Sequence, residues 1–454
     1  MTTIYSASWI LPVSAPPIEN GAVAIDGERI VGVGVRGGLL SRFPQARVEE
    51  FAQAIILPGL INTHTHLELT VLRGYLENKE ADFYSWLRKL TTARLEIMTP
   101  DDISVSAEWG ACEAARAGIT CVGDASDSGV LALRALHAVG LRGIVFQESF
   151  GPDPRLSQEN FEKLKNKVTE LRDVESAMVR AGVSPHAPYT VCAAQLEMIA
   201  DYALAANLPV MMHAAESRAE DLLLREGTGL FAEGLARRSI EWHAPGKSTT
   251  QFLQQTGILG TRPLLAHCIR VDERDIETLA ETESKVAHCP KSNAKLMHGR
   301  APFAKFLDKN IAVGLGSDSV ASNNTCDILE EARFAVLLSR TAMADTDKDR
   351  IVSAQDVFSA ATQGGAVCLG LGGEVGELSE GSQADLTILS MRGVHQVPNY
   401  DPVVTAIFAS SGRDVLLTMV AGKEVYRDGR MINVDEERLR ARMGEIAKKL
   451  SFVL

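Results

Sequence analysis

The feature that most constrains the fold is a regular alternation of short apolar runs with longer helical patterns, from about residue 57 to residue 373. Apolar runs of this length predict buried parallel strands, and glycines close several of the helical stretches between them. Eight strands are expected, the first just after Pro58 and the others at 119–124, 142–146, 179–183, 208–212, 263–266, 285–287 and 311–315. Strand–helix–strand units build parallel sheets, so we expect an α/β fold with a closed (β/α)8 TIM barrel.

The first 56 residues have a different texture, with short strand-like runs and few helical patterns. Runs at 22–25 and 30–34 flank an Asp26-Gly27 pair, which is a hairpin signal. Such a β unit has too little apolar content to be stable alone. We therefore expect it to pair with strands from elsewhere in the chain.

Composition excludes several classes of partner. The net charge of -12 argues against nucleic acid and against anionic membranes, because neither basic patches nor long apolar runs are evident. The 7 cysteines are scattered, without a Cys-x-x-Cys pair, so neither a disulfide framework nor a thiolate metal site is indicated. A cytoplasmic enzyme is the resulting expectation.

Chemically capable side chains stand at the ends of the expected strands. Active sites of barrels gather at the carboxyl ends of the strands, where these residues would meet. Each one alone has a simpler reading as a hydrogen-bonded structural residue, but their joint occurrence indicates one functional site. They are His64, His66, His186, His213, His267, His288 and Asp318.

The pair His64-x-His66 is the first indication of a metal. Side chains at i and i+2 of a strand leave the same face, so both imidazoles would point into one site. Neutral imidazoles at this spacing bind first-row divalent cations when other segments supply the remaining ligands. The competing reading is two polar residues at a strand end.

The motifs together resemble the amidohydrolase superfamily, in its branch of cytosine, guanine, adenosine-type and chlorotriazine aminohydrolases. They are His64-x-His66, His213-x-x-Glu216, Ala266-His267-Cys268, the run 288–293 and the run 314–319. The resemblance covers nearly the whole chain. It implies that His64, His66, His213 and Asp318 bind the metal.

One divalent cation is expected, zinc before iron, because imidazole suits both metals. Relatives with two metals hold them through a bridging carboxylate, often a modified lysine on strand four. The expected end of strand four, 183–186, has no lysine, and Glu148 is the only nearby carboxylate that could bridge. Metal analysis that finds two ions per chain would overturn this expectation.

The resemblance also assigns catalytic roles. Glu216 would protonate a ring nitrogen and relay protons to the leaving ammonia. His267 would hydrogen-bond the attacking water or the developing oxyanion, and Asp318 would accept the water's proton. The simpler readings are a helix-start carboxylate for Glu216 and a satisfied barrel histidine for His267.

Three segments indicate the class of substrate. The run 83–87, which contains Trp86, would form a lid after strand one. It resembles S-adenosylhomocysteine/methylthioadenosine deaminases and aminodeoxyfutalosine deaminases, and so does the run 184–189, whose His186 would contact the purine. Arg155 matches an arginine that binds the distal carboxylate of the substrate, a task for which the guanidinium fork is suited. An exposed helix-start residue is the alternative reading of Arg155.

Two positions depart from that pattern. A second carboxylate-binding arginine would fall on Gln147, and the glutamate that holds the ribose hydroxyls aligns with either Leu95 or Glu96. The expected substrate is a 6-aminopurine nucleoside such as methylthioadenosine, S-adenosylhomocysteine or aminodeoxyfutalosine.

Three other functions stay open on the same scaffold. They are a guanine, 8-oxoguanine or pterin deaminase, a chlorotriazine-type hydrolase that removes chloride, and a metabolite-binding barrel without catalysis. A deaminase of the type that acts on extruded bases is excluded, because the chain lacks His-x-Glu with Pro-Cys-x-x-Cys.

The resemblance further implies three structural units. Residues 1–56 and 374–434 would form a composite β-sandwich, with a second hairpin around Ala421-Gly422, and residues 57–373 the catalytic barrel. Residues 435–454 would form a C-terminal helix, in which Leu439, Met443, Ile446 and Leu450 share one face. That face would dock on the body or on another subunit, and a homo-oligomer, a dimer or larger, is expected.

Overall fold

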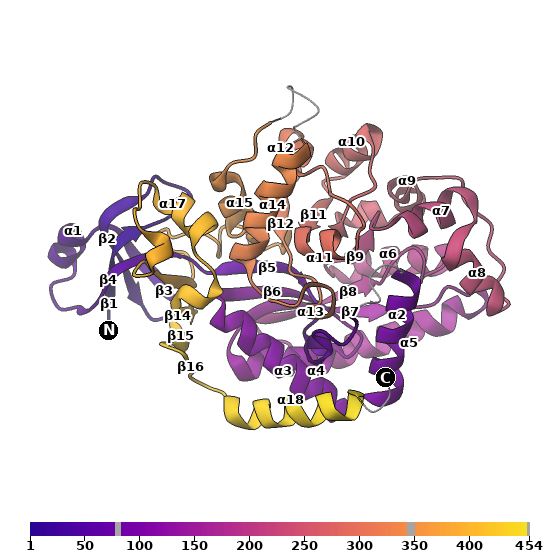
Figure 1. Ribbon diagram of the computed structural model, residues 1–454, viewed down its shortest axis with the longest axis horizontal. Coiled ribbons are helices and arrows are strands. Elements are labelled where there is room, and N and C mark those ends of the chain that lie inside the picture. The colour runs from indigo at the N-terminus through magenta and orange to yellow at the C-terminus, as the bar shows by residue number, and fades with distance from the viewer. Residues whose placement is uncertain (78–82, 343–349, 452–454) are drawn as a thin grey trace.

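The computed structural model describes residues 1–77, 83–342 and 350–451, which form an α/β fold with three sheets (Figure 1). Two of the sheets have four parallel strands each. The first is ordered β5-β6-β7-β8 and the second β12-β11-β10-β9. Their bounds are β5 (Leu60–Thr65), β6 (Ile119–Ser126), β7 (Arg142–Ser149), β8 (Val179–Pro185), β9 (Met211–Ala214), β10 (Leu264–His267), β11 (Lys285–His288) and β12 (Val313–Leu315).

Parallel bridges join the two sheets on both sides. Val183 pairs with Val210, and Thr65 pairs with Asp318. Near the second bridge the backbone N–H of Asp318 donates to the carbonyl of His64 at 2.9 Å. The carboxyl ends of all eight strands therefore open on one side of the molecule.

All eight expected strands are present, and three of them, β9, β10 and β12, begin one to three residues later than expected. Strand β9 begins at Met211 instead of residue 208, because Pro209 has no N–H to donate to a sheet. The carbonyl of Pro209 still accepts from the N–H of Val183 at 3.0 Å. Strand β12 begins at Val313 instead of residue 311.

Helices alternate with these strands and pack on their outer faces (Figure 1). Helix α5 ends at Arg172, and Ser176 then accepts hydrogen bonds from the N–H groups of Met178 and Val179, which turns the chain into β8. The helices between β5 and β9 are α2 (Phe83–Thr92), α3 (Pro100–Arg116), α4 (Gly129–Val139), α5 (Ser157–Arg172) and α6 (Ala193–Ala206). Those after β9 are α7 (Arg218–Glu226), α8 (Gly229–Arg237), α9 (Thr249–Gln255), α10 (Glu273–Glu281), α11 (Pro290–Lys295), α12 (Phe303–Asp308), α13 (Val320–Asn323), α14 (Ile328–Ala342), α15 (Ala354–Ala360) and α16 (Gln363–Cys368).

Apolar side chains from both parallel sheets meet in one buried cluster. It contains Ile61 and Ile144 from the first sheet and Met211, Leu264 and Ala287 from the second. Burial of apolar surface between the sheets is the main favourable contribution to such a core. The seven cysteines are buried and free, as the absence of a disulfide pattern predicted.

The third sheet unites the two ends of the chain. Its eight strands are ordered β16-β15-β14-β13-β4-β1-β2-β3. The central strand β4 pairs with β1 in parallel and with β13 antiparallel, so the expected partner of the N-terminal strands is the C-terminal segment. The bounds are β1 (Thr3–Ile10), β2 (Ile18–Asp26), β3 (Arg29–Val35), β4 (Arg47–Pro58), β13 (Leu386–Ser390), β14 (Val415–Val420), β15 (Lys423–Arg427) and β16 (Arg430–Met431).

Both expected hairpins are confirmed in this sheet, β2–β3 and β14–β15. A buried ion pair connects the sheet to the parallel strands, with Arg142 Nε and Nη2 at 2.9 and 3.1 Å from the carboxylate of Asp385. Gly59, between β4 and β5, has no room for a side chain, because a Cβ there would lie 2.0 Å from Thr120 Oγ1. The passage from one sheet to the other is thus closely packed.

The C-terminal helix α18 (Glu436–Ser451) lies along α3 (Figure 1). Leu439, Ile446 and Leu450 are buried, and Lys449 Nζ lies 2.8 Å from Asp102 of α3. The expected apolar face therefore docks on the body of the same chain. Among the residues that the structure describes, no helix is long and apolar enough to cross a membrane.

Candidate active site

The four side chains that were expected to bind a metal converge at the carboxyl ends of β5, β9 and β12. Nε2 of His64 and Nε2 of His66 each lie 3.5 Å from Oδ1 of Asp318. Nε2 of His66 lies 3.3 Å from Nε2 of His213. The i, i+2 spacing on β5 thus brings both imidazoles to one point, as the sequence predicted.

The chemistry of these donors fits a divalent cation. Burial lowers the pKa of His64 to about 4 and the pKa of His213 well below its ordinary value, so both imidazoles are neutral. The backbone carbonyl of His186 accepts from Nδ1 of His213 at 2.9 Å, which leaves Nε2 free as a ligand. Nε2 of His64 is buried without a hydrogen-bond partner in the described structure. An unsatisfied buried nitrogen of this kind is expected of a ligand.

Asp318 is held in place by its neighbours. Ser292 and Ser322 donate to Oδ2 at 2.5 and 3.0 Å, and the N–H of Ser319 donates to Oδ1 at 2.7 Å. Burial opposes ionisation, but hydrogen bonding from His64 and the charge of His267 keep the pKa of Asp318 well below its usual range. The backbone of Asp318 is left-handed, with φ 56. A carboxylate with this support is rigid and ionised.

His267 also belongs to this group. Ligand atoms of His64, His213, His267 and Asp318 all lie within 4.8 Å of one another. Nδ1 of His267 is 2.8 Å from Oδ1 of Asn293, while Nε2 is buried without a hydrogen-bond partner among the described residues. Burial alone would lower the pKa of His267, but the charges of Glu216 and Asp318 raise it. Because this Nε2 has no partner, His267 is not simply a structural histidine with both ring nitrogens hydrogen-bonded.

Glu216 lies in the loop between β9 and α7, where it is 3 % exposed. The hydroxyl of Tyr189 donates to Oε2 at 3.2 Å. Burial raises the pKa of Glu216 to about 7. Helix α7 is capped by Ser217, which accepts from the N–H of Glu220, so Glu216 is not needed as a helix-start carboxylate. A buried carboxyl with such a pKa is suited to general acid–base chemistry near neutral pH.

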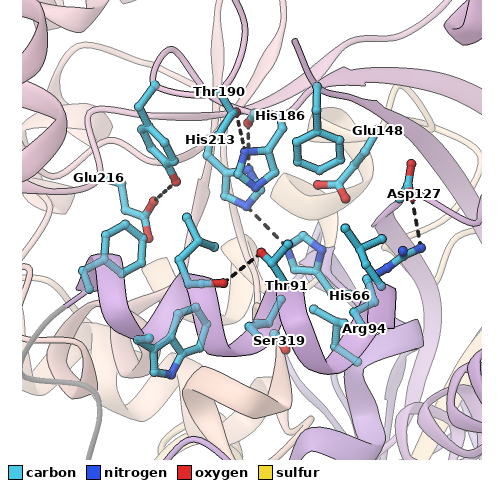
Figure 2. Close-up of a pocket in the computed structure, with 18 of the residues that line it drawn as sticks. His66, Thr91, Arg94, Asp127, Glu148, His186, Thr190, His213, Glu216 and Ser319 are labelled. Atoms are coloured by element: carbon cyan, nitrogen blue, oxygen red, sulfur yellow. Dashed lines mark hydrogen bonds and ion pairs between the residues drawn. The ribbon is translucent and has the colours of Figure 1, made fainter. Parts of the chain in front are cut away.

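A cavity of about 540 Å³ opens above these residues (Figure 2). Trp86 on α2 lines the cavity and is 5 % exposed, so the segment expected to form a lid lies at the site. His186 also lines it, with Nδ1 fixed 2.8 Å from Thr190 Oγ1. In Figure 2, Glu216 lies on one side of the histidines and Glu148 on the other.

Arg155 is not brought to this cavity. Its side chain is 70 % exposed, and its guanidinium pairs with Asp153, with Nη2 at 2.7 Å from Oδ2. Gln147 donates to the carbonyl of Asp127 at 2.9 Å and does not line the cavity. Two positions could match the sugar-binding glutamate of the resembled enzymes. Glu96 is exposed and lies outside the cavity, whereas Leu95 lines the cavity.

Several residues of the site were not identified from the sequence. Arg94 and Asp127 line the cavity together with Glu148, which had been considered only as a metal bridge. His298 Nε2 lies 3.6 Å from Oε1 of Glu216. The sequence signal for His298 is its place a few residues after the run 288–293, directly before Gly299.

Comparison with known proteins agrees with the family resemblance of the sequence motifs. The model of the Amidohydrolase family matches residues 55–425. A 5-methylthioadenosine/S-adenosylhomocysteine deaminase of Syntrophobacter fumaroxidans is 32% identical over 434 residues, covering 95% of this chain and 94% of the relative. The enzyme of the same name from Symbiobacterium thermophilum is 33% identical over 454 residues, covering 98% of both chains.

Solved structures agree in fold. An adenosine deaminase from Xanthomonas campestris with bound zinc has a TM-score of 0.87 at 26% identity and covers 99% of this chain and 98% of its own. An atrazine chlorohydrolase from Arthrobacter aurescens TC1, complexed with zinc, has a TM-score of 0.83 at 23% identity and covers 98% of this chain and 100% of its own. The second likeness bears on the fold alone. The protein is a hydrolase acting on C–N bonds, and its chain belongs to the amidohydrolase family.

Proposed function

We propose that this protein is a metal-dependent deaminase that replaces the amine of a 6-aminopurine nucleoside by oxygen and releases ammonia. The observation that carries the proposal is Glu216, a buried carboxyl of raised pKa directly beside the histidine and aspartate cluster. The names of the relatives support it, and methylthioadenosine, S-adenosylhomocysteine and aminodeoxyfutalosine are the substrates to test first. The proposed location is the cytoplasm.

His64, His66, His213 and Asp318 would hold one divalent cation, and zinc is the first choice before iron. The neutral imidazoles and the supported carboxylate favour such an ion, and the similar adenosine deaminase from Xanthomonas campestris was crystallised with zinc. A cation held there would lower the pKa of a water molecule, so that hydroxide is available near neutral pH.

Three residues of this chain would move the protons. Asp318 accepts a proton from the attacking water and passes it to the departing amine. Glu216 gives its proton to the adjacent ring nitrogen and recovers one from the same water, so the two protons of water end on the ring and on ammonia. His267 offers Nε2 to the developing oxyanion.

Trp86 and His186 would hold the ring. Trp86 presents apolar surface from α2, and His186 stands beside the metal-facing histidines with its ring 4.6 Å from that of His213. Stacking and shape fix a planar heterocycle over the reacting groups in such cavities. Arg155 keeps only the sequence argument for a substrate contact.

The same proposal includes the architecture. We infer that the two parallel sheets form one closed (β/α)8 barrel over residues 57–373, since bridges join them at both edges. The sheet of both chain ends, residues 1–56 and 374–434, would fold into a small β-sandwich around its own apolar cluster. Residues 435–454 would form the terminal unit, of which the structure describes residues 435–451 with helix α18. The active unit would be a homo-oligomer of two or more chains.

The proposal is tested by an ammonia-release screen of the metal-loaded protein. The panel contains adenosine, methylthioadenosine, S-adenosylhomocysteine, aminodeoxyfutalosine, guanine, 8-oxoguanine, pterins and a chlorotriazine. Ammonia from an aminopurine nucleoside with the highest kcat/KM is the expected result. Chloride without ammonia, or turnover of guanine or pterins alone, would assign one of the other functions.

A further inference from the structure

Glu148 is a buried carboxyl without an evident task in the reaction. It is the residue before Ser149, the last residue of strand β7. Its side chain lines the cavity, and the residue is 6 % exposed. Its Oε1 is fully buried and makes no hydrogen bond within the described residues. Because an unsatisfied buried oxygen is costly, a ligand donor at this point is the natural explanation. Figure 2 shows the carboxyl beside His186, on the side of the histidines opposite Glu216.

A second metal ion does not account for this carboxyl. A Glu148 oxygen lies within 4.8 Å of ligand atoms of His186 and His213. His213, however, uses Nδ1 for the carbonyl of His186, and its Nε2 faces His66. One imidazole nitrogen serves one metal, so only Glu148 and His186 would remain for a second ion. Two protein ligands are too few for a stable site.

The charges around Glu148 favour hydrogen-bond donors. Burial and the charges of Glu68 and Asp127 raise its pKa well above the ordinary value. The nearest cation, Arg94, is already engaged, with Nε at 2.6 Å from Glu68 and Nη2 at 3.2 Å from Asp127. A group that donates to Glu148 would satisfy the carboxyl, whereas an anionic group would meet further carboxylates.

We propose that Glu148 binds the sugar hydroxyls of the nucleoside substrate. This inference rests on the proposed function. Apart from the reacting amine, the strong hydrogen-bond donors that adenosine, methylthioadenosine and S-adenosylhomocysteine have in common are the 2′- and 3′-hydroxyls. A carboxyl offers two acceptor oxygens, which match a pair of neighbouring hydroxyls. Glu148 thereby selects nucleosides with an intact diol over deoxynucleosides.

The experiment compares kcat/KM for adenosine, 2′-deoxyadenosine and 3′-deoxyadenosine. The wild-type protein is expected to lose roughly 10- to 100-fold on at least one deoxynucleoside, because a buried oxygen of Glu148 would then be left without a partner. In Glu148→Ala the three nucleosides are expected to react within about threefold of one another, because the discriminating carboxyl is gone. Glu148→Gln, which keeps one acceptor oxygen and the shape, should give an intermediate ratio.

The matched control is Glu197→Gln, at an exposed glutamate on α6, which should keep the wild-type ratios. Melting temperature and metal content of each variant show whether it is folded and loaded. The inference is overturned if wild type does not discriminate, or if the discrimination persists in both Glu148 variants. Absence of ammonia release from every nucleoside by the wild type would instead reject the proposed function, so the two failures are distinguishable.

Discussion

Nε2 of His298 lies 3.6 Å from Oε1 of Glu216. Nε2 of His267 approaches the same oxygen at 3.8 Å. Asn293 fixes the imidazole of His267 and the backbone of His298, since its Oδ1 lies 2.8 Å from Nδ1 of His267 and its carbonyl accepts from the backbone N–H of His298 at 3.0 Å. Phe83 packs edge-on against His298, with ring centroids 4.6 Å apart. Glu216 is therefore confined between two histidines fixed by α11.

Replacing His298 should loosen Glu216. We expect His298→Ala to lower kcat by roughly tenfold with a smaller change in KM, because His298 acts on the position of the proton donor. Steady-state kinetics on the best nucleoside checks this, with the exposed His243→Ala as control. Equal kcat and KM in the two variants would show that His298 does not position Glu216.

The activity should decline on the alkaline side of neutrality. Glu216 must carry a proton to act as an acid, and burial raises its pKa to about 7, so kcat/KM should fall as pH rises through that value. The pH profile of kcat/KM measures this directly. A profile flat from pH 6 to 9 would be inconsistent with a protonated Glu216.

The same pKa has a consequence for stability. A carboxyl whose pKa is raised by folding weakens the folded state as pH climbs from its unfolded value near 4.5 to about 7. Glu216→Gln cannot ionise, so its melting temperature at pH 8 should exceed that of the wild type when both are compared in metal-free form. A lower melting temperature for the variant would contradict the burial argument.

Loss of His213 should remove the metal. His213→Ala deletes a neutral imidazole at the centre of the cluster, so we expect metal content well below one ion per chain and activity reduced by about a thousandfold or more. Elemental analysis after dialysis, together with ammonia release, provides the check. Full metal occupancy in the variant would mean that His213 is not a ligand.

Replacing Arg155 should have little effect on substrate binding. Its guanidinium pairs with Asp153 and lies outside the lining of the cavity, so Arg155→Ala should change KM by no more than about twofold. S-adenosylhomocysteine, which carries a carboxylate, is the substrate to use. A KM rise of tenfold for this substrate alone would restore the role that the sequence suggested for Arg155.

The sequence predicted the part of the site that lies at the carboxyl ends of the strands. His64 and His213 lie on β5 and β9, His66 directly follows β5, and Asp318 lies three residues after β12. Parallel strands bring these ends together. The insufficient core of residues 1–56 predicted that these strands pair with another segment of the chain, and the family resemblance implied that this partner is the C-terminal segment. These features depend on regular geometry and needed no knowledge of loops.

Loop residues were beyond such reasoning. Arg155 binds Asp153 two residues away, a local contact that periodicity does not reveal. His298 reaches Glu216 only because the chain after α11 turns through residues with positive φ. Trp86 and His186 line the cavity as expected, one on a helix and the other directly after strand β8.

The most direct test of the central claim is ammonia release from methylthioadenosine by the metal-loaded protein, compared with Glu216→Gln at equal metal content. Glutamine keeps the shape of Glu216 but cannot donate the acidic proton, so a rate at least about a hundredfold lower is predicted. One ammonia should form per nucleoside consumed in the wild type. The account is contradicted if the wild type releases no ammonia from any aminopurine nucleoside, or if the variant matches its rate.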